Sequence, residues 1–107
     1  MKHRNRRKCS EVAYLSGVFI ELYVLHAAVK EPVAAGQLVE VLTSRGYDIN
    51  NRSISALLRK FERRGWLRAH GTRSGTVHYF QTSANGRKAL EQSKPLMYNL
   101  VAEFSDR

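Results

Sequence analysis

The stretch RSISALLRKFERR, residues 52–64, decides the fold, because it separates into an apolar face and a basic face when it is placed on a helix. At about 100° per residue, one narrow arc holds the large apolar side chains Ile54, Leu57, Leu58 and Phe61. The opposite arc and its flanks hold Arg52, Ser55, Ala56, Arg59, Lys60 and Arg63. So short a helix is stable only when it is packed, and we therefore expect the apolar arc to dock on a domain and the arginines to face outward.

The surplus of positive charge is confined to two segments. The chain has 18 Lys and Arg against 9 Asp and Glu, a formal net charge of +9. Residues 1–8 hold five of these cations and no acid, and residues 45–73 hold eight cations against two acids. A generic solubilising surface mixes its signs, so this separation favours a polyanionic partner. A row of guanidiniums with a small residue between them suits the major groove of duplex DNA in particular.

Length and composition limit the class of protein. A chain of 107 residues, 43% of them hydrophobic, is expected to form one domain with a packed core. The longest apolar run, residues 18–29, is interrupted by Glu21 and His26, which predicts a buried helix and not a membrane span. A lone Cys9 builds neither a disulfide framework nor a zinc site, so a reducing cytosol is the expected compartment.

The spacing of apolar residues predicts three helices before a hairpin, at about residues 11–30, 34–45 and 52–64. The first is apolar over more than half of its circumference, so we expect one side to pack on the domain and the other on a second subunit. Gly46 is well placed to end the second helix and Gly65 the third. Asn50 or Asn51 is a suitable N-cap for the third helix.

The second half of the chain predicts a β-hairpin followed by a last helix. Strands at residues 66–70 and 76–81 flank a five-residue loop with Gly at each end. Thr82 is expected to cap a helix that starts at Ser83, and Pro95 is expected to kink or break it. The expected fold is therefore mainly α with a small β-hairpin, a winged helix-turn-helix in which the third helix reads DNA and the hairpin is the wing. We assign residues 1–9 to a disordered basic arm and residues 10–107 to this one domain, with a C-terminal dimerisation helix region at 83–107.

Several motifs are those of one family. They are Leu25-His26, Glu31-Pro32-Val33, the Arg45-Gly46-Tyr47 end of the second helix, Ser53-Ile54, Leu57-Leu58, Phe61-Glu62-Arg63, Gly65-Trp66-Leu67, Tyr79, Gln81-Thr82 and Gly86-Arg87-Lys88-Ala89-Leu90. Over about two-thirds of its length the chain thereby resembles the PadR-like winged-helix transcription regulators. Two of these motifs, Gly65-Trp66-Leu67 and Thr82 followed by Gly86, also occur in other winged-helix families such as MarR-like proteins.

The resemblance implies a DNA-binding homodimer whose first and last helices form the interface. We assign this interface to Phe19, Tyr23, Met97, Leu100, Val101 and Phe104. The chain departs from the family pattern at Ala34-Ala35-Gly36 and at Ser55-Ala56, both near the expected DNA surface, so an operator sequence is not carried over.

The recognition helix supplies the first group of predicted DNA contacts. Arg59 and Arg63 are the candidates for base reading, since a guanidinium gives two hydrogen bonds to guanine O6 and N7. Ser55 and Ala56 lie nearer the helix N-terminus, where a hydroxyl or a methyl group can meet base edges. Arg52 and Ser53, in the first turn, are expected to contact phosphate. Lys60 is expected either to contact phosphate or to be solvated.

The wing and the arm supply the other predicted contacts. Arg73, between Thr72 and Ser74 at the tip of the hairpin loop, is expected to enter the minor groove, although a solubilising role is the alternative. The N-terminal arm is expected either to follow the DNA backbone or minor groove, or to be a tail that does not bind DNA. The cations of the arm assigned to DNA are Arg4, Arg6, Arg7 and Lys8.

No arrangement of residues indicates catalysis, a metal or a cofactor. The four histidines show no ligand spacing with Cys9 or with the acids, and there is no Gly-rich phosphate loop. Nothing marks a pocket for a small-molecule effector. The sequence therefore predicts a cytoplasmic, sequence-specific DNA-binding regulator, with three rivals: a plasmid or phage accessory or nucleoid protein of low sequence selectivity, an RNA-binding protein, and a winged-helix protein-interaction module.

Overall fold

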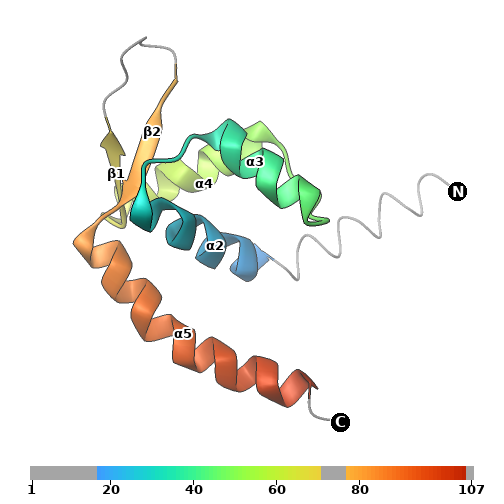
Figure 1. Ribbon diagram of the computed structural model, residues 1–107. Coiled ribbons are helices and arrows are strands. Elements are labelled where there is room, and N and C mark those ends of the chain that lie inside the picture. The colour runs from blue at the N-terminus through green and yellow to red at the C-terminus, as the bar shows by residue number, and fades with distance from the viewer. Residues whose placement is uncertain (1–16, 71–76, 106–107) are drawn as a thin grey trace, which may run out of the picture.

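The computed structural model describes residues 17–70 and 77–105. In chain order these residues form α2 (Gly17–Lys30), α3 (Ala35–Ser44), α4 (Asn51–Arg63), β1 (Leu67–His70), β2 (Tyr79–Thr82) and α5 (Ala84–Ser105). Figure 1 shows α2, α3 and α4 gathered beside the hairpin, while α5 runs away from them toward the C-terminus. The predicted winged-helix architecture, mainly α with one small β-hairpin, is confirmed.

The core forms where the apolar stripes of α2, α3 and α4 meet the hairpin. Ile54, Leu58 and Phe61 of α4 are each at most 2% exposed, as the helical pattern predicts, and Leu57 at the edge of the stripe is half-buried. They pack in one cluster with buried residues from the other elements, which include Val24, Leu25, Leu38, Leu42, Leu67, Phe80 and Leu90. Burial of this stripe fixes the opposite face of α4 toward the outside.

Local backbone chemistry sets both ends of α4. Asn50 is the N-cap: its Oδ1 accepts a hydrogen bond of 2.9 Å from the Ser53 backbone N–H. Beyond the helix, Gly65 has a φ of +82°, a conformation that residues with a Cβ rarely adopt. Gly46 ends α3 in the same way, with a φ of +99°. The predicted positions of both helix ends are therefore confirmed, and the choice between the two asparagines falls on Asn50.

The hairpin is antiparallel and shorter than the sequence predicts. Leu67 pairs with Thr82 and His70 with Tyr79, whereas Trp66, Val77 and His78 lie outside the strands. Phe80 also exchanges two backbone hydrogen bonds of 2.9 Å with Val33, so the segment before α3 runs along β2. This pairing ties the hairpin to the helices beside α4.

The expected cap of the last helix is wrong, and so is the expected break at Pro95. Ser83, and not Thr82, occupies the position before α5: its Oγ accepts a hydrogen bond of 3.0 Å from the Gly86 N–H. Thr82 belongs to β2 and donates its hydroxyl to the Leu25 carbonyl at 2.7 Å, a partner that is distant in sequence. Pro95 does not break α5, which is continuous from Ala84 to Ser105, and the alternative expectation of a kink there stays a prediction. Proline removes one hydrogen bond to the fourth residue before it, and here both residues concerned, Pro95 and Glu91, are exposed to water.

The first helix begins at Gly17 in the described part of the chain, and its predicted start near residue 11 lies outside that part. Across residues 17–70 and 77–105, none of the helices has the length together with the hydropathy that spanning a bilayer requires.

Candidate nucleic-acid interface

The outward face of α4 carries the predicted row of arginines. Arg52, Arg59 and Arg63 are all exposed, and so is the small Ala56 between them. None of the three arginines forms an ion pair with another described residue. The row therefore keeps its charge available to an external anion.

A groove separates this face of α4 from the hairpin. Its volume is about 390 Å³, and Leu58 and Phe80 form its buried apolar floor. The other residues that line it come from the start of α3, from α4 and from the hairpin: Ala34, Ala35, Gly36, Ser55, Arg59, Glu62, Ala69, Val77 and His78. Two of the predicted base-reading residues, Ser55 and Arg59, thus border one groove with the hairpin, whereas Arg63 and Ala56 do not line it.

Two of the residues predicted to bind DNA already have partners within the protein. Lys60 lies on the other flank of α4, where its Nζ is 3.4 Å from Glu21 Oε2 of α2. The Ser53 hydroxyl takes part in the cap, donating to the Asn50 carbonyl at 3.1 Å and accepting from the Asn50 N–H at 3.4 Å. Their predicted phosphate contacts remain predictions, and these intramolecular bonds compete with them.

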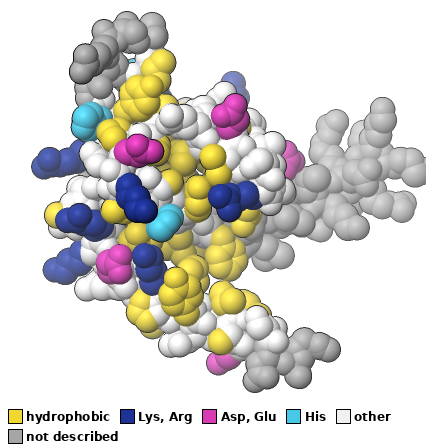
Figure 2. All heavy atoms as spheres, viewed as in Figure 1, with side chains coloured by type: hydrophobic (Ala, Val, Ile, Leu, Met, Phe, Trp, Pro, Cys, Tyr) yellow, Lys and Arg dark blue, Asp and Glu magenta, His cyan; other side chains and the backbone are white. Residues whose placement is uncertain are grey.

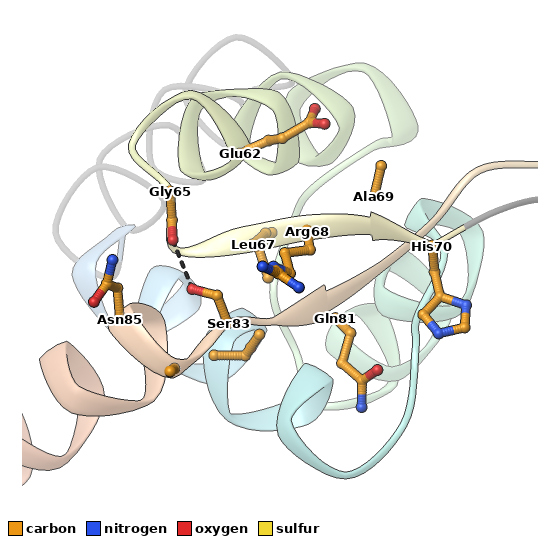
Figure 3. Close-up of a pocket in the computed structure, with 11 residues that line it drawn as sticks. Glu62, Gly65, Leu67, Arg68, Ala69, His70, Gln81, Ser83 and Asn85 are labelled. Atoms are coloured by element: carbon orange, nitrogen blue, oxygen red, sulfur yellow. Dashed lines mark hydrogen bonds between the residues drawn. The ribbon is translucent and has the colours of Figure 1, made fainter.

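The outer face of the hairpin carries polar residues that were not among the predicted DNA contacts. Arg68 and His70 of β1 alternate with buried Leu67, and Arg68 lies opposite Gln81. Figure 3 shows Ala69 on the side of the hairpin that faces Glu62 of α4, and His70 and Gln81 on the opposite side. The period-two alternation of residues 67–70 was the signal that could have identified this face.

The predicted wing and arm contacts lie outside the described residues. They are Thr72, Arg73 and Ser74 of the hairpin loop, and Arg4, Arg6, Arg7 and Lys8 of the N-terminal arm. Among the described residues, no three His, Cys, Asp or Glu side chains come together as a metal site would require.

A second, apolar groove lies between α2 and α5, and it brings together three residues predicted for a dimer interface. Phe19, Tyr23 and Met97 line it together with Leu22, Leu90 and Tyr98, around a volume of about 290 Å³. The other three predicted residues lie further along α5 and are exposed: Leu100, Val101 and Phe104, the last at 71%. Figure 2 shows hydrophobic side chains gathered between α2 and α5 and along α5.

Polar side chains border this apolar groove. His26 and Lys94 are among its lining residues. The guanidinium of Arg45, at the end of α3, lies 5.6 Å from the ring centre of Tyr23, and the His26 ring lies 6.2 Å from the same ring. The groove therefore has an apolar interior with cationic groups at its edge.

The chain matches one family model in sequence. The model of the ribonuclease R winged-helix domain matches residues 21–77, slightly more than half of the chain. No curated protein matches the chain in sequence.

Three solved structures that resemble the chain over most of its length are described as transcription regulators. A PadR family transcriptional regulator from Eggerthella lenta has a TM-score of 0.80 at 21% identity, covering 98% of this chain and 95% of that one. The transcriptional regulator BldR from Sulfolobus solfataricus has a TM-score of 0.71 at 18% identity, covering 99% of this chain and 84% of that one. A PadR family transcription regulator from Clostridium difficile has a TM-score of 0.68 at 12% identity, covering 80% of this chain and 97% of that one.

The family model covers the helices and the first strand that build the groove beside α4, and the structural matches extend the likeness into α5. The chain therefore belongs to the family of winged-helix domains that the ribonuclease R model describes, and its fold is that of the PadR-like winged-helix regulators.

Proposed function

We propose that this chain is a sequence-specific transcriptional regulator that binds double-stranded DNA as a homodimer. The simplest form of this function is repression through a roughly palindromic operator. One observation carries the proposal: Arg52, Arg59 and Arg63 form an exposed row on a helix that is docked through its opposite face beside a hairpin. The function is one of binding, and no catalytic step is part of it.

The dimensions of α4 favour a duplex as the partner. Its 13 residues give a length of about 20 Å, and the major groove of B-DNA admits a helix of this kind. A guanidinium there donates two hydrogen bonds to a guanine edge, which distinguishes that base by about 1–3 kcal/mol. The hairpin beyond the groove then lies where a wing meets the neighbouring minor groove.

The apolar groove between α2 and α5 supports the homodimer. Phe19, Tyr23 and Met97 line it, and Leu100 and Phe104 of α5 are exposed beyond it. Exposed apolar residues gathered in this way mark an interaction site. A two-fold axis through this region would place two copies of α4 on one duplex, with half-site centres about 10 base pairs apart or a multiple of that.

The resemblance to known regulators supports the same proposal. The structures from Eggerthella lenta, Sulfolobus solfataricus and Clostridium difficile are each described as transcription regulators. Their likeness in fold supports the class of function. Their identity to this chain is too low to carry over an operator sequence.

The test is a fluorescence-anisotropy titration over a salt series against a randomised duplex pool, with selection of the bound duplexes. We expect salt-sensitive binding and enrichment of a palindrome, and we expect Arg59→Ala and Arg63→Ala to lose that enrichment. Lys88→Ala is the matched control, because Lys88 is an exposed cation of α5 that does not line the groove beside α4.

Three other results would contradict the proposal, each in a different way. Salt-sensitive binding without enrichment would indicate an accessory or nucleoid protein of low selectivity. Tighter binding to a matched single-stranded RNA would indicate an RNA partner. No affinity for either nucleic acid at physiological salt would indicate a protein-interaction module.

A further inference from the structure

Glu62 is the one acidic residue of α4, and it lies on the side of the helix that faces the hairpin. Ser55, Arg59 and Glu62 line the groove beside the hairpin together, one to two helical turns apart. Figure 3 shows the carboxylate of Glu62 on the same side of the hairpin as Ala69. A negative charge therefore stands in the surface that is proposed to meet DNA.

The carboxylate of Glu62 forms no ion pair with another described residue. The ion pairs among the described residues join Lys60 to Glu21 and Lys94 to Glu91, and neither involves Glu62. The side chain of Glu62 is exposed, and the arginines at positions 59 and 63 of the same helix do not form an ion pair with it. A negative charge would weaken the binding of phosphate by a surface that served only to attract phosphates. The acidic residue at position 62 therefore requires a different explanation.

The chemistry of base edges supplies that explanation. An ionised carboxylate only accepts hydrogen bonds. In the major groove, guanine offers the acceptors O6 and N7 and thymine offers O4. Cytosine offers only its N4 amino group as a donor, whereas adenine offers its N6 amino group beside the acceptor N7. A carboxylate at the base edges is therefore fully matched by cytosine, meets both a donor and the acceptor N7 at adenine, and is repelled by guanine and thymine.

We infer that Glu62 is a specificity-determining residue that accepts a hydrogen bond from the N4 amino group of a cytosine in the operator. Arg59 and Glu62 line the same groove, three residues and about 4.5 Å apart along the helix axis, compared with about 3.4 Å between successive base pairs. Arg59 and Glu62 then address the same or neighbouring base pairs, the first through guanine and the second through cytosine. This inference rests on the proposed function, since it assigns a base to a residue of that same interface.

The test compares single base-pair variants of the operator selected by the unaltered protein. Binding of each duplex is measured at one salt concentration for the unaltered protein and for Glu62→Ala, Glu62→Gln and Glu40→Gln. Glu40 is the matched control, because it is an exposed acid of α3 that does not line the groove, and its loss changes the net charge by the same amount. Thermal melting of each variant checks that the fold is retained.

We expect replacement of one cytosine to weaken binding of the unaltered protein about tenfold. Glu62→Ala should lose this preference, and Glu62→Gln should shift it toward adenine, whose N6 and N7 match an amide. Glu40→Gln should keep the preference for cytosine.

The opposite result is a Glu62→Ala protein that binds every duplex more tightly by one common factor and keeps all base preferences. Glu62 would then act only by repelling phosphate, and the inference would be wrong while the proposed function stood. If the unaltered protein itself enriched no operator, the proposed function would fail and the inference with it.

Discussion

The Nζ of Lys60 lies 3.4 Å from Oε2 of Glu21, an ion pair that joins α4 to α2. The same ammonium group lies 5.9 Å from the ring centre of Phe61. Lys60 is therefore directed along the flank of the domain, whereas Arg52 on the outward face has no ion-pair partner among the described residues. Lys60 and Arg52 of one helix thus have different environments, although the helical pattern predicted that both contact DNA.

This difference predicts different salt dependences of DNA binding. Arg52→Ala should lower the slope of log affinity against log salt by about 0.9, because one phosphate contact is lost. Lys60→Ala should leave the slope nearly unchanged, and it should alter the free energy of unfolding by less than about 1 kcal/mol, since both partners are exposed. Anisotropy titrations over a salt series measure the slope. An equal decrease for both variants would show that Lys60 leaves Glu21 for the DNA.

The cap of α4 predicts a difference between two neighbouring asparagines. Asn50 accepts the Ser53 N–H at 2.9 Å, whereas Asn51 is already the first residue of the helix. Asn50→Ala should lower the free energy of unfolding by about 1 kcal/mol, because one backbone donor loses its partner. Asn51→Ala is the matched control and should have little effect. Urea denaturation compares the two, and equal losses would argue against the cap.

The first turn of α5 lies so close to the backbone after α4 that only glycine fits at position 86. A Cβ at Gly86 would overlap the carbonyl oxygen of Trp66 and approach Thr82 Cγ2 to 2.8 Å. Gly86→Ala should therefore lower the free energy of unfolding by about 1–3 kcal/mol.

Gly36→Ala is the control for this prediction. Gly36 is also helical, and nothing lies within 4 Å of the Cβ position there. The added Cβ should stabilise α3 by about 0.5–1 kcal/mol, through the lower entropy of the unfolded chain. Denaturation midpoints that move in the same direction for both variants would contradict the close approach at Gly86.

The parts of the fold that the sequence predicts well depend on local patterns. The burial of Ile54, Leu58 and Phe61 follows from a 3.6-residue period, and the helix ends at Gly46 and Gly65 follow from the backbone freedom of glycine. These signals are contained within a few neighbouring residues, so the spacing alone is sufficient to find them.

The parts that the sequence misses depend on partners distant in the chain. Threonine is a residue type that often caps helices. The Thr82 hydroxyl instead donates to the Leu25 carbonyl, 57 residues away, and Ser83 takes the cap position. The ion pair of Lys60 was missed for the same reason, since its partner Glu21 is 39 residues away, while the predicted phosphate contact of Lys60 stays a prediction. Neither contact leaves a trace in the local pattern, because only the tertiary packing of α2 brings these residues together.

The exposed end of α5 predicts that the protein dimerises through it. Leu100 is 55% exposed and lies beyond the groove that Phe19 and Met97 line. Leu100→Glu should raise the dimer dissociation constant at least tenfold, because a charge would be buried in an apolar contact, and it should weaken binding to a palindromic duplex. Gln92→Glu, at an exposed position of α5 outside this groove, is the charge-matched control. Analytical ultracentrifugation measures the constant. If Leu100→Glu associates as tightly as the control, the interface lies elsewhere, and two-fold binding through α5 would have to be abandoned.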